Sequence, residues 1–367
     1  MRLLIVTYDF PPTIGGIETR VTNYISCLTR LGHQVIVVAI SPSCKSASVE
    51  RFLGATVYRY PPAYLSIVRA FLRVRWVLRG HPPPMGVFIL TGANTALGIS
   101  TLIYGRLRGV KTGIFLYGKD ILSSKRHPLK LLLLHLALTF TDRVGVNSRA
   151  TQRLLPNLPH EKVRLLYPGV DLDELGRFRM DMEPEGKRIL FVGRLIKRKG
   201  VDDLLHAFRL VLQEMPDARL VIVGDGPQKP VLMRLAERLG ISSQVEFKGA
   251  LRGEALYREY QRCAVFVAPS KTLPDDVEGF GIVFLEAGFF GKPSVGTWSG
   301  GIPEAVLHNR TGILVPEGDV KALAKVILRL LRDRELAHRL GNNAQKRVIK
   351  EFSWKKATKR LLEMLQD

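Results

Sequence analysis

Short apolar runs rich in β-branched residues alternate with longer helical patterns along this chain, and the alternation begins again after residue 186. Such alternation is typical of a parallel sheet whose strands are connected by helices. The chain is therefore predicted to be α/β, with two Rossmann-like doubly wound domains. The predicted strands are 3–8, 35–40, 57–60, 87–90, 112–117, 143–147 and 163–167, followed by 189–193, 220–224, 245–249, 265–269, 294–297 and 313–315.

The polar stretch 181–186, which contains proline and glycine, is suited to a linker between two domains. We expect an N-terminal domain over 1–180 and a C-terminal domain over 187–350. A last amphipathic helix, 354–365, is expected to pack back on the first domain, so that 353–367 belongs with it. In doubly wound sheets ligands bind beyond the carboxyl ends of the strands. We therefore expect a cleft between the two domains.

The composition is that of an ordinary globular protein, with 46% hydrophobic and 24% charged residues. Three widely spaced cysteines show no metal-ligand spacing, so we expect them to be reduced and structural. The first apolar run is too short for a signal peptide, and the longest one, 129–140, is too short to span a bilayer. A cytoplasmic protein without a transmembrane helix is expected.

The net charge of +22 is distributed unevenly along the chain. Residues 1–180 hold 24 lysines and arginines against nine acidic residues, whereas 181–367 hold 31 against 24. Such a field attracts nucleic acid, anionic lipid or phosphorylated substrates, and charge alone does not choose among them. A basic nucleic-acid-binding protein is disfavoured, because no RNA-binding module, zinc finger or aromatic-and-basic stacking motif is recognisable.

Residues 278–286, EGFGIVFLE, hold two carboxylates around a glycine turn before an apolar helix. Gly279 and Gly281 allow the backbone to approach a ligand closely. Glu278 in the loop and Glu286, about two turns along a helix that begins near Gly281, could reach the sugar and the ribose of one sugar nucleotide. An amphipathic helix with solvent-facing glutamates is the alternative, and this segment alone does not separate the two.

Arg194 and Lys199 lie in a basic turn after a predicted strand. Preorganised cations would stabilise the charge that develops when a nucleoside diphosphate departs, with arginine holding two phosphate oxygens and lysine acting as a point charge. Gly15 and Gly16 precede a helix predicted to start near Ile17, so their amides could face a phosphate. The alternatives are a solvated basic turn and a tight glycine turn.

Six loop motifs together resemble the group 1 family of retaining GT-B glycosyltransferases, which move a sugar from a nucleotide diphosphate carrier to an acceptor. The resemblance covers nearly the whole chain. It implies the GT-B fold, a nucleotide-sugar donor as co-substrate, no cofactor and no bound metal, since the basic pair would take over the role of magnesium. The motifs are 11–12 with 15–16, 168–171, 191–194 with 199–200, 223–226, 278–286 and 300–304.

The resemblance also implies roles for individual residues. Glu278 would contact the transferred sugar and, with Arg194 and Lys199, carry the catalysis, while Glu304 would support the same pocket. A nucleotide-sugar epimerase on the same architecture is the second enzymatic hypothesis, and product analysis separates the two. The donor-binding residues implied are Gly15, Gly16, Gly193, Leu251, Gly279, Phe280, Gly281, Ile282, Val283 and Glu286.

The acceptor-side loop departs from the family pattern. Many relatives carry a histidine before the glycine, whereas this chain has Tyr117 before Gly118. A phenol with an ordinary pKa of about 10 is a poor base at neutral pH. This fits a front-face retaining path, in which the departing phosphate oxygen takes the acceptor proton. Asp120 is expected either to position the acceptor or the sugar, or to form the turn.

Residues 276–287 look most like members that transfer mannose from GDP-mannose to phosphatidylinositol-type or other glycolipid acceptors. A lipid-linked or saccharide acceptor is therefore expected, and UDP-glucose and UDP-N-acetylglucosamine stay open as donors. The pattern of 64–79 predicts a helix with Arg69 and further arginines on one side, which suits a peripheral position on the anionic inner face of the membrane. A helix docked on its own sheet explains that pattern equally well.

Overall fold

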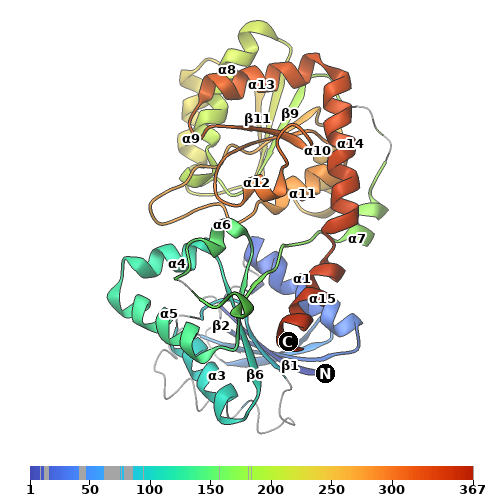
Figure 1. The fold of residues 1–367 in the computed structure, drawn as a ribbon. Helices are drawn as coiled ribbons and strands as arrows, with labels where there is room; N and C mark the ends of the chain where they lie inside the picture. The colour runs from blue at the N-terminus through green and yellow to red at the C-terminus, as the bar shows by residue number, and fades with distance from the viewer. Residues whose placement is uncertain are drawn as a thin grey trace. The chain divides into compact units, whose positions relative to one another are not determined.

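The computed structural model describes residues 1–8, 10–11, 16–40, 47–61, 75, 77, 86–93, 95–156, 158–180, 182 and 184–366. The chain forms two compact α/β units (Figure 1). The first comprises Met1–Gly169 and Trp354–Asp367, and the second comprises Val170–Ser353. Each unit contains one sheet built almost wholly of parallel strands, so the predicted α/β class is confirmed.

The first unit contains an eight-stranded sheet in the order β3-β4-β2-β1-β5-β6-β7-β8. Apart from Arg2 and Thr7 of β1, its central strands β1 and β5 are apolar and buried on both faces, as a strand covered by helices on both sides requires. The edge pair β3/β4 is antiparallel and every other neighbouring pair is parallel. The strands are β1 Arg2–Thr7, β2 Gln34–Ile40, β3 Ser48–Phe52, β4 Ala55–Tyr60, β5 Gly86–Ile89, β6 Lys111–Leu116, β7 Arg143–Val146 and β8 Val163–Leu165.

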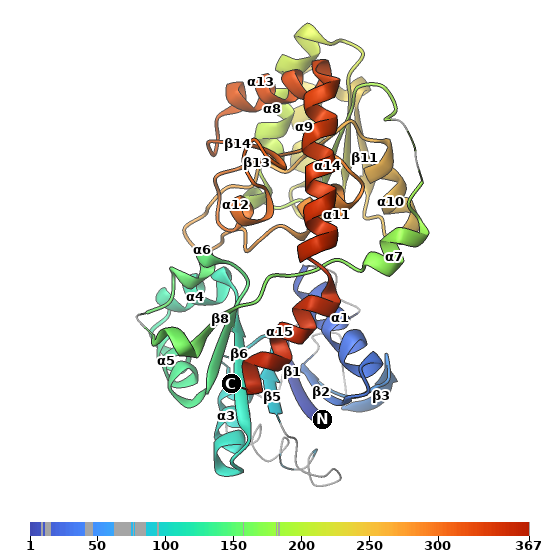
Figure 2. The ribbon, with the colours of Figure 1, turned by 45° about the vertical axis from the view of Figure 1, so that its right-hand side comes forward.

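The last helix of the chain, α15 (Trp354–Gln366), packs on this first sheet (Figure 2). A Cβ atom at Gly86 would lie 2.5 Å from Leu365, and one at Gly113 would lie 2.6 Å from Met364, so glycines in neighbouring strands make room for the helix. The Trp354 ring meets Tyr24 edge to face at 5.5 Å. The other described helices of the unit are α1 Gly16–Arg30, α3 Ala96–Leu107, α4 Gly118–Lys125, α5 Pro128–Phe140 and α6 Arg149–Gln152.

The second unit contains a six-stranded, all-parallel sheet in the order β11-β10-β9-β12-β13-β14. The strands are β9 Arg188–Val192, β10 Arg219–Val223, β11 Val245–Gly249, β12 Val265–Val267, β13 Ser294–Thr297 and β14 Gly312–Val315. The helices are α7 Leu172–Arg177, α8 Val201–Glu214, α9 Lys229–Arg238, α10 Gly253–Arg262, α11 Ile282–Phe289, α12 Ile302–Ala305, α13 Val320–Arg332 and α14 Arg334–Glu351.

Several predicted features lie outside the described residues. Gly15, Arg69 and most of the helix expected over 64–79 belong to this group. Within the described ranges, no helix combines the length and the apolar character that crossing a bilayer would require.

Candidate active site

The loop after β12 brings Glu278 into contact with three hydrogen-bond donors of the second unit. Its Oε2 atom accepts from Arg198 Nη1 at 2.7 Å, from Lys199 Nζ at 2.6 Å and from Ser270 Oγ at 3.1 Å. The residue is only 8% exposed. Within the described part of the chain, no hydrogen bond reaches the other oxygen, Oε1. One carboxylate oxygen is thus fixed by protein groups while its neighbour keeps its acceptor capacity.

A tight packing of two loops places the cations on Glu278. Lys197–Lys199 form a 3₁₀ turn that ends at Gly200, whose φ of +65° favours glycine. A Cβ atom there would lie 2.0 Å from the carbonyl oxygen of Pro269, so only glycine allows the turn to approach the end of β12. The Lys271 amide also donates to the Arg198 carbonyl at 2.7 Å.

The charges around Glu278 decide its protonation state. Burial by itself would raise the pKa of Glu278, but Lys199 and Arg198 hold that pKa well below its usual range. Burial lowers the pKa of Lys199, and Arg198 and Arg194 add to the effect, although Glu278 opposes it. Glu278 is therefore ionised at neutral pH and acts only as a hydrogen-bond acceptor.

The two cations that the sequence paired have different surroundings. Lys199 lies on Glu278, whereas Arg194 is exposed and forms no ion pair with a described residue. Arg198, which the sequence analysis did not single out, is the second inward cation and also binds Asp276 through Nε at 3.0 Å. Four of the six residues 194–199 are basic, and only the turn geometry shows which of them point inward.

The glycine turn after Glu278 leads directly into α11. Gly281 adopts a φ of +86° and precedes the first helical residue, Ile282. Phe280 is buried, with its ring centroid 5.7 Å from that of Phe352. Glu286 is four residues into α11, so the expectation of about two turns is wrong and the true offset is little more than one turn. The predicted donor-binding residues Ile282 and Val283 form the first turn of α11 and, like Gly193 at the end of β9, are partly exposed.

Glu286, the second carboxylate, accepts a hydrogen bond from an aromatic hydroxyl. Tyr260 on α10 donates its OH to Glu286 Oε2 at 2.6 Å. Burial raises the pKa of Glu286, and nearby Glu174 adds to this, while the Tyr260 hydrogen bond works in the opposite direction. Tyr260 is absent from the predicted site, because 26 residues of chain separate it from its partner.

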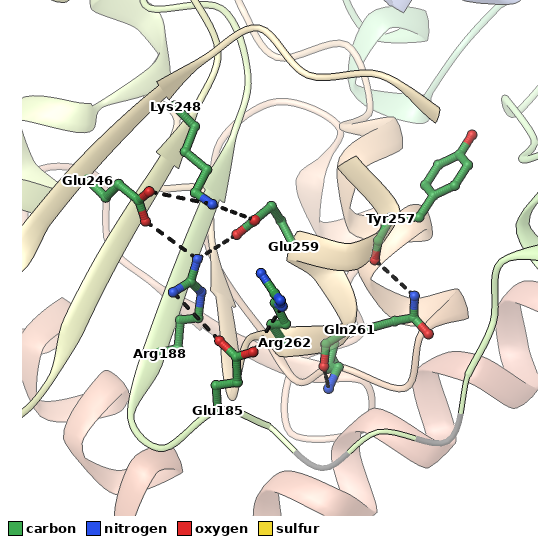
Figure 3. A network of polar contacts seen from close by, with 9 residues as sticks. Glu185, Arg188, Glu246, Lys248, Tyr257, Glu259, Gln261 and Arg262 are labelled. Atoms are coloured by element: carbon green, nitrogen blue, oxygen red, sulfur yellow. Dashed lines mark hydrogen bonds and ion pairs between the residues drawn. The ribbon is translucent and has the colours of Figure 1, made fainter. Parts of the chain in front are cut away.

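Lys248, near the end of β11, is engaged within the protein (Figure 3). Its Nζ lies 2.7 Å from Glu259 Oε1 and 3.5 Å from Glu246. Arg188 contacts the other oxygen of Glu259 at 2.7 Å. Burial would raise the pKa of Glu259, but these two cations lower it. The side chain of Lys248 is therefore part of an ion network, and the partly exposed Leu251 follows it beyond the end of β11.

The two residues of the first unit that were predicted to lie on the acceptor side, Tyr117 and Asp120, adopt a helix-capping arrangement. Asp120 Oδ2 accepts from the backbone amide of Tyr117, the N-cap of α4, at 3.1 Å. Of the two roles expected for Asp120, the structure displays the turn-forming one. Tyr117 is 7% exposed, and the guanidinium of buried Arg20 lies 5.6 Å from its ring and 4.5 Å from that of Phe115.

Two further predicted site residues are Gly16 and Glu304. Gly16 is the exposed first residue of α1. Glu304 lies in α12, and its carbonyl accepts from Arg347 at 2.8 Å. Across the described ranges, no three His, Cys, Asp or Glu side chains gather as metal ligands would.

Sequence comparisons match both units to glycosyltransferases. The family model described as "Glycosyl transferases group 1" matches residues 176–347, and the one described as "Glycosyltransferase Family 4" matches 14–174. A GDP-mannose-dependent alpha-(1-6)-phosphatidylinositol monomannoside mannosyltransferase of Mycobacterium tuberculosis is 30% identical, over 100% of this chain and 98% of its own length. An N-acetyl-alpha-D-glucosaminyl L-malate synthase of Bacillus anthracis is also 30% identical, over 81% of this chain and 77% of its own.

Solved structures share the fold at lower identity. Anabaena HepE in complex with UDP matches with a TM-score of 0.80 and 20% identity, and each chain is covered to 100%. Sucrose-phosphate synthase from Thermosynechococcus elongatus matches with a TM-score of 0.78 and 21% identity, over 100% of this chain and 98% of its own. These neighbours have the GT-B architecture, which confirms the predicted fold.

Proposed function

This chain belongs to the group 1 glycosyltransferase family, and from that premise we propose that it transfers a hexose, with mannose as the first candidate, from a nucleotide diphosphate sugar to a lipid-linked or saccharide acceptor. The observation that carries the proposal is the environment of Glu278. An ionised carboxylate with one oxygen fixed by Arg198, Lys199 and Ser270 can present its second oxygen to the hydroxyls of a hexose.

The proposed donor side uses charge in two places. Lys199, oriented by Glu278, and the exposed Arg194 would neutralise the diphosphate as it departs. Glu286, with one oxygen on Tyr260, would accept from the ribose hydroxyls. The Gly279–Gly281 turn and the start of α11 would place backbone amides near the phosphates. Together these groups favour a leaving nucleoside diphosphate.

The proposed reaction retains the anomeric configuration by a front-face path. The bond between the hexose C1 and the β-phosphate oxygen breaks, and the acceptor hydroxyl forms a new bond to C1 on the same face. The departing phosphate oxygen takes the hydroxyl proton, so no protein base is required. Tyr117 in place of a histidine is compatible with this path, since a phenol is a weak base at neutral pH.

GDP-mannose is the donor we propose, because the mannosyltransferase relatives align over the whole chain and bear that donor in their names. The glucosaminyl relative aligns over a smaller share, which makes UDP-N-acetylglucosamine the second candidate. The cations of the 194–199 turn would serve in place of a metal. We therefore expect transfer of the sugar to continue when a chelator removes divalent metal ions.

The test is a thermal-shift screen of GDP-mannose, UDP-glucose and UDP-N-acetylglucosamine, followed by analysis of the product. A ligand present at a hundred times its dissociation constant stabilises the folded state by about 2.7 kcal/mol, which is readily measured. We expect GDP-mannose to give the largest shift and the glycoside product to keep the donor's anomeric configuration. Stabilisation by none of the three donors, or release of an epimerised sugar nucleotide without acceptor, contradicts the proposal.

A further inference from the structure

The turn between α4 and α5 carries a feature that sugar transfer does not use. Residues 125–132, Lys-Arg-His-Pro-Leu-Lys-Leu-Leu, are all exposed, and we call this segment the basic leucine tip. Leu129, Leu131 and Leu132 are 68%, 45% and 55% exposed. Single exposed leucines are common on soluble proteins, but three within four residues form a patch that calls for an explanation.

The fold of the first unit does not need these leucines. The buried face of α5 is supplied by Leu134, Ala137 and Leu138, which belong to the core of the unit. Both ribbon views show α4 and α5 side by side at the periphery of this unit (Figures 1 and 2). The first turn of α5 therefore extends past the contacts that hold the helix, with its leucines directed to solvent.

The charge around the leucines has one sign. Lys125, Arg126 and Lys130 belong to the tip, and no Asp or Glu occurs between residues 121 and 141. Lys125 and Lys130 form no ion pair with a described residue. Apolar side chains among exposed cations suit one kind of partner best, an interface that is apolar below a layer of negative charge.

We propose that the basic leucine tip docks on the surface of an anionic lipid bilayer. The leucines would enter the boundary between headgroups and acyl chains, and the cations would contact the anionic headgroups. The tip is separate from the 64–79 segment. The inference goes beyond the proposed function, because docking is measured without a donor sugar and either proposal can fail alone.

The experiment is flotation of the full chain with vesicles of phosphatidylglycerol and phosphatidylcholine in equal parts, and with vesicles of phosphatidylcholine alone. We expect binding to the anionic vesicles and little binding to the neutral ones. Each cation near such a surface contributes about fivefold in affinity at low salt, so Lys125→Gln with Arg126→Gln and Lys130→Gln should weaken binding on the order of a hundredfold. Leu129→Ser with Leu132→Ser should weaken it by about tenfold or more.

Matched controls lie elsewhere on the chain. Lys321→Gln with Lys325→Gln and Arg329→Gln removes the same charge from the exposed face of α13, and Leu107→Ser removes a leucine that is 72% exposed. Both control variants should bind like the unchanged protein. No flotation of the unchanged protein, or equal losses in tip and control variants, overturns the proposal. The proposal is also overturned if sedimentation equilibrium shows that the unchanged protein is a dimer, and if Leu129→Ser with Leu132→Ser makes it a monomer without reducing vesicle binding.

A second readout does not depend on loss of binding. A tryptophan introduced by Leu131→Trp should be quenched by brominated acyl chains on anionic vesicles, whereas one introduced by Leu107→Trp should not. Quenching that is equal at the two positions contradicts insertion of the tip. Because this measurement uses variants that keep an apolar side chain, it decides the matter even where the serine variant fails to fold.

Discussion

The two units hold the polar residues at the ends of their strands by different means. In the second unit Glu278 is surrounded by Arg198, Lys199 and Ser270, so its charge and its position are fixed together. In the first unit Asp120 binds a backbone amide and Tyr117 lies among aromatic and guanidinium groups. In the second unit the protein fixes the position of a charged group, whereas in the first unit it fixes mainly the shape of the loop. Under the proposed function, the fixed charge of the second unit would stabilise the transition state and the fixed shape of the first unit would position the acceptor.

The largest effect is expected from Glu278→Gln, which keeps the shape of the side chain and removes its charge. We expect kcat/KM to fall about a hundred- to a thousandfold, as when one preorganised transition-state contact is lost. The fall in kcat/KM is measured from initial rates of nucleoside diphosphate release in the presence of the acceptor. The matched control is Asp276→Asn, which also removes a charge from Arg198 but leaves Glu278 in place. Equal activity of the Glu278 variant would show that the charge is not needed.

Arg198→Met tests the charge comparison through acid stability. A carboxylate whose folded pKa is lowered stabilises the fold above its unfolded pKa of about 4.3, and this contribution is lost as the pH falls through the folded pKa. Because Lys199 and Arg198 lower the pKa of Glu278, removing Arg198 should raise it. The acid-induced loss of stability should then be smaller in total and should be complete at a higher pH. We also expect Arg198→Met to lower the free energy of unfolding at pH 7 by about 2 kcal/mol.

Urea midpoints at pH 7, 5, 4, 3 and 2 check this expectation. The exposed Arg194→Met is the control, and its midpoints should follow those of the unchanged protein. Parallel pH profiles for the Arg198 variant and the unchanged protein would mean that Arg198 does not determine the ionisation of Glu278.

Tyr260→Phe should have a smaller effect, because it removes one hydrogen bond to Glu286 and leaves the carboxylate in place. The expected loss is about 1 kcal/mol, or roughly a fivefold increase in the dissociation constant of the donor. Isothermal titration with the sugar nucleotide measures it, and Tyr257→Phe, whose hydroxyl binds Glu174, is the matched control. Equal weakening in both variants would assign the effect to the packing of α10.

The smallest effects are expected in the first unit. Asp120→Ala removes a helix-capping interaction and should reduce the free energy of unfolding by about 1 kcal/mol, measured by urea denaturation. Tyr117→Phe should change kcat less than tenfold, because loss of a true general base costs about a hundredfold or more. A larger loss in kcat for the Tyr117 variant would show that the phenol acts chemically, and would overturn the comparison between the units.

Most strands could be predicted from the sequence, because a buried parallel strand is apolar on both faces and its residues reveal it without knowledge of its neighbours. The predicted strands all appear within two residues of the positions expected. The exception is β3, Ser48–Phe52, which is absent from the prediction. Its sequence SVERF is largely exposed at the sheet edge, and it is held by antiparallel pairing with β4 and by the packing of Phe52 against Phe10.

The sequence predicted those residues of the candidate site that lie together in one continuous motif. It did not predict the residues that only folding brings next to that motif. The spacing of Glu278 and Glu286 is visible in one segment, and so is the cluster that contains Lys199. Arg198 and Tyr260 reach the carboxylates from 80 and 26 residues away, and neither lies in a pattern that distinguishes it from its neighbours. Contacts of this kind are determined by packing, which residue types alone do not specify.

The position of α15 has a consequence for biosynthesis. The first sheet leaves room beside Gly86 and Gly113 for a helix that the ribosome makes only after the whole of Val170–Ser353. At about 5–20 residues per second, the early strands would wait roughly ten to forty seconds with that apolar surface uncovered. During translation, chaperones would therefore be expected to engage the N-terminal half of the nascent polypeptide more than the C-terminal half.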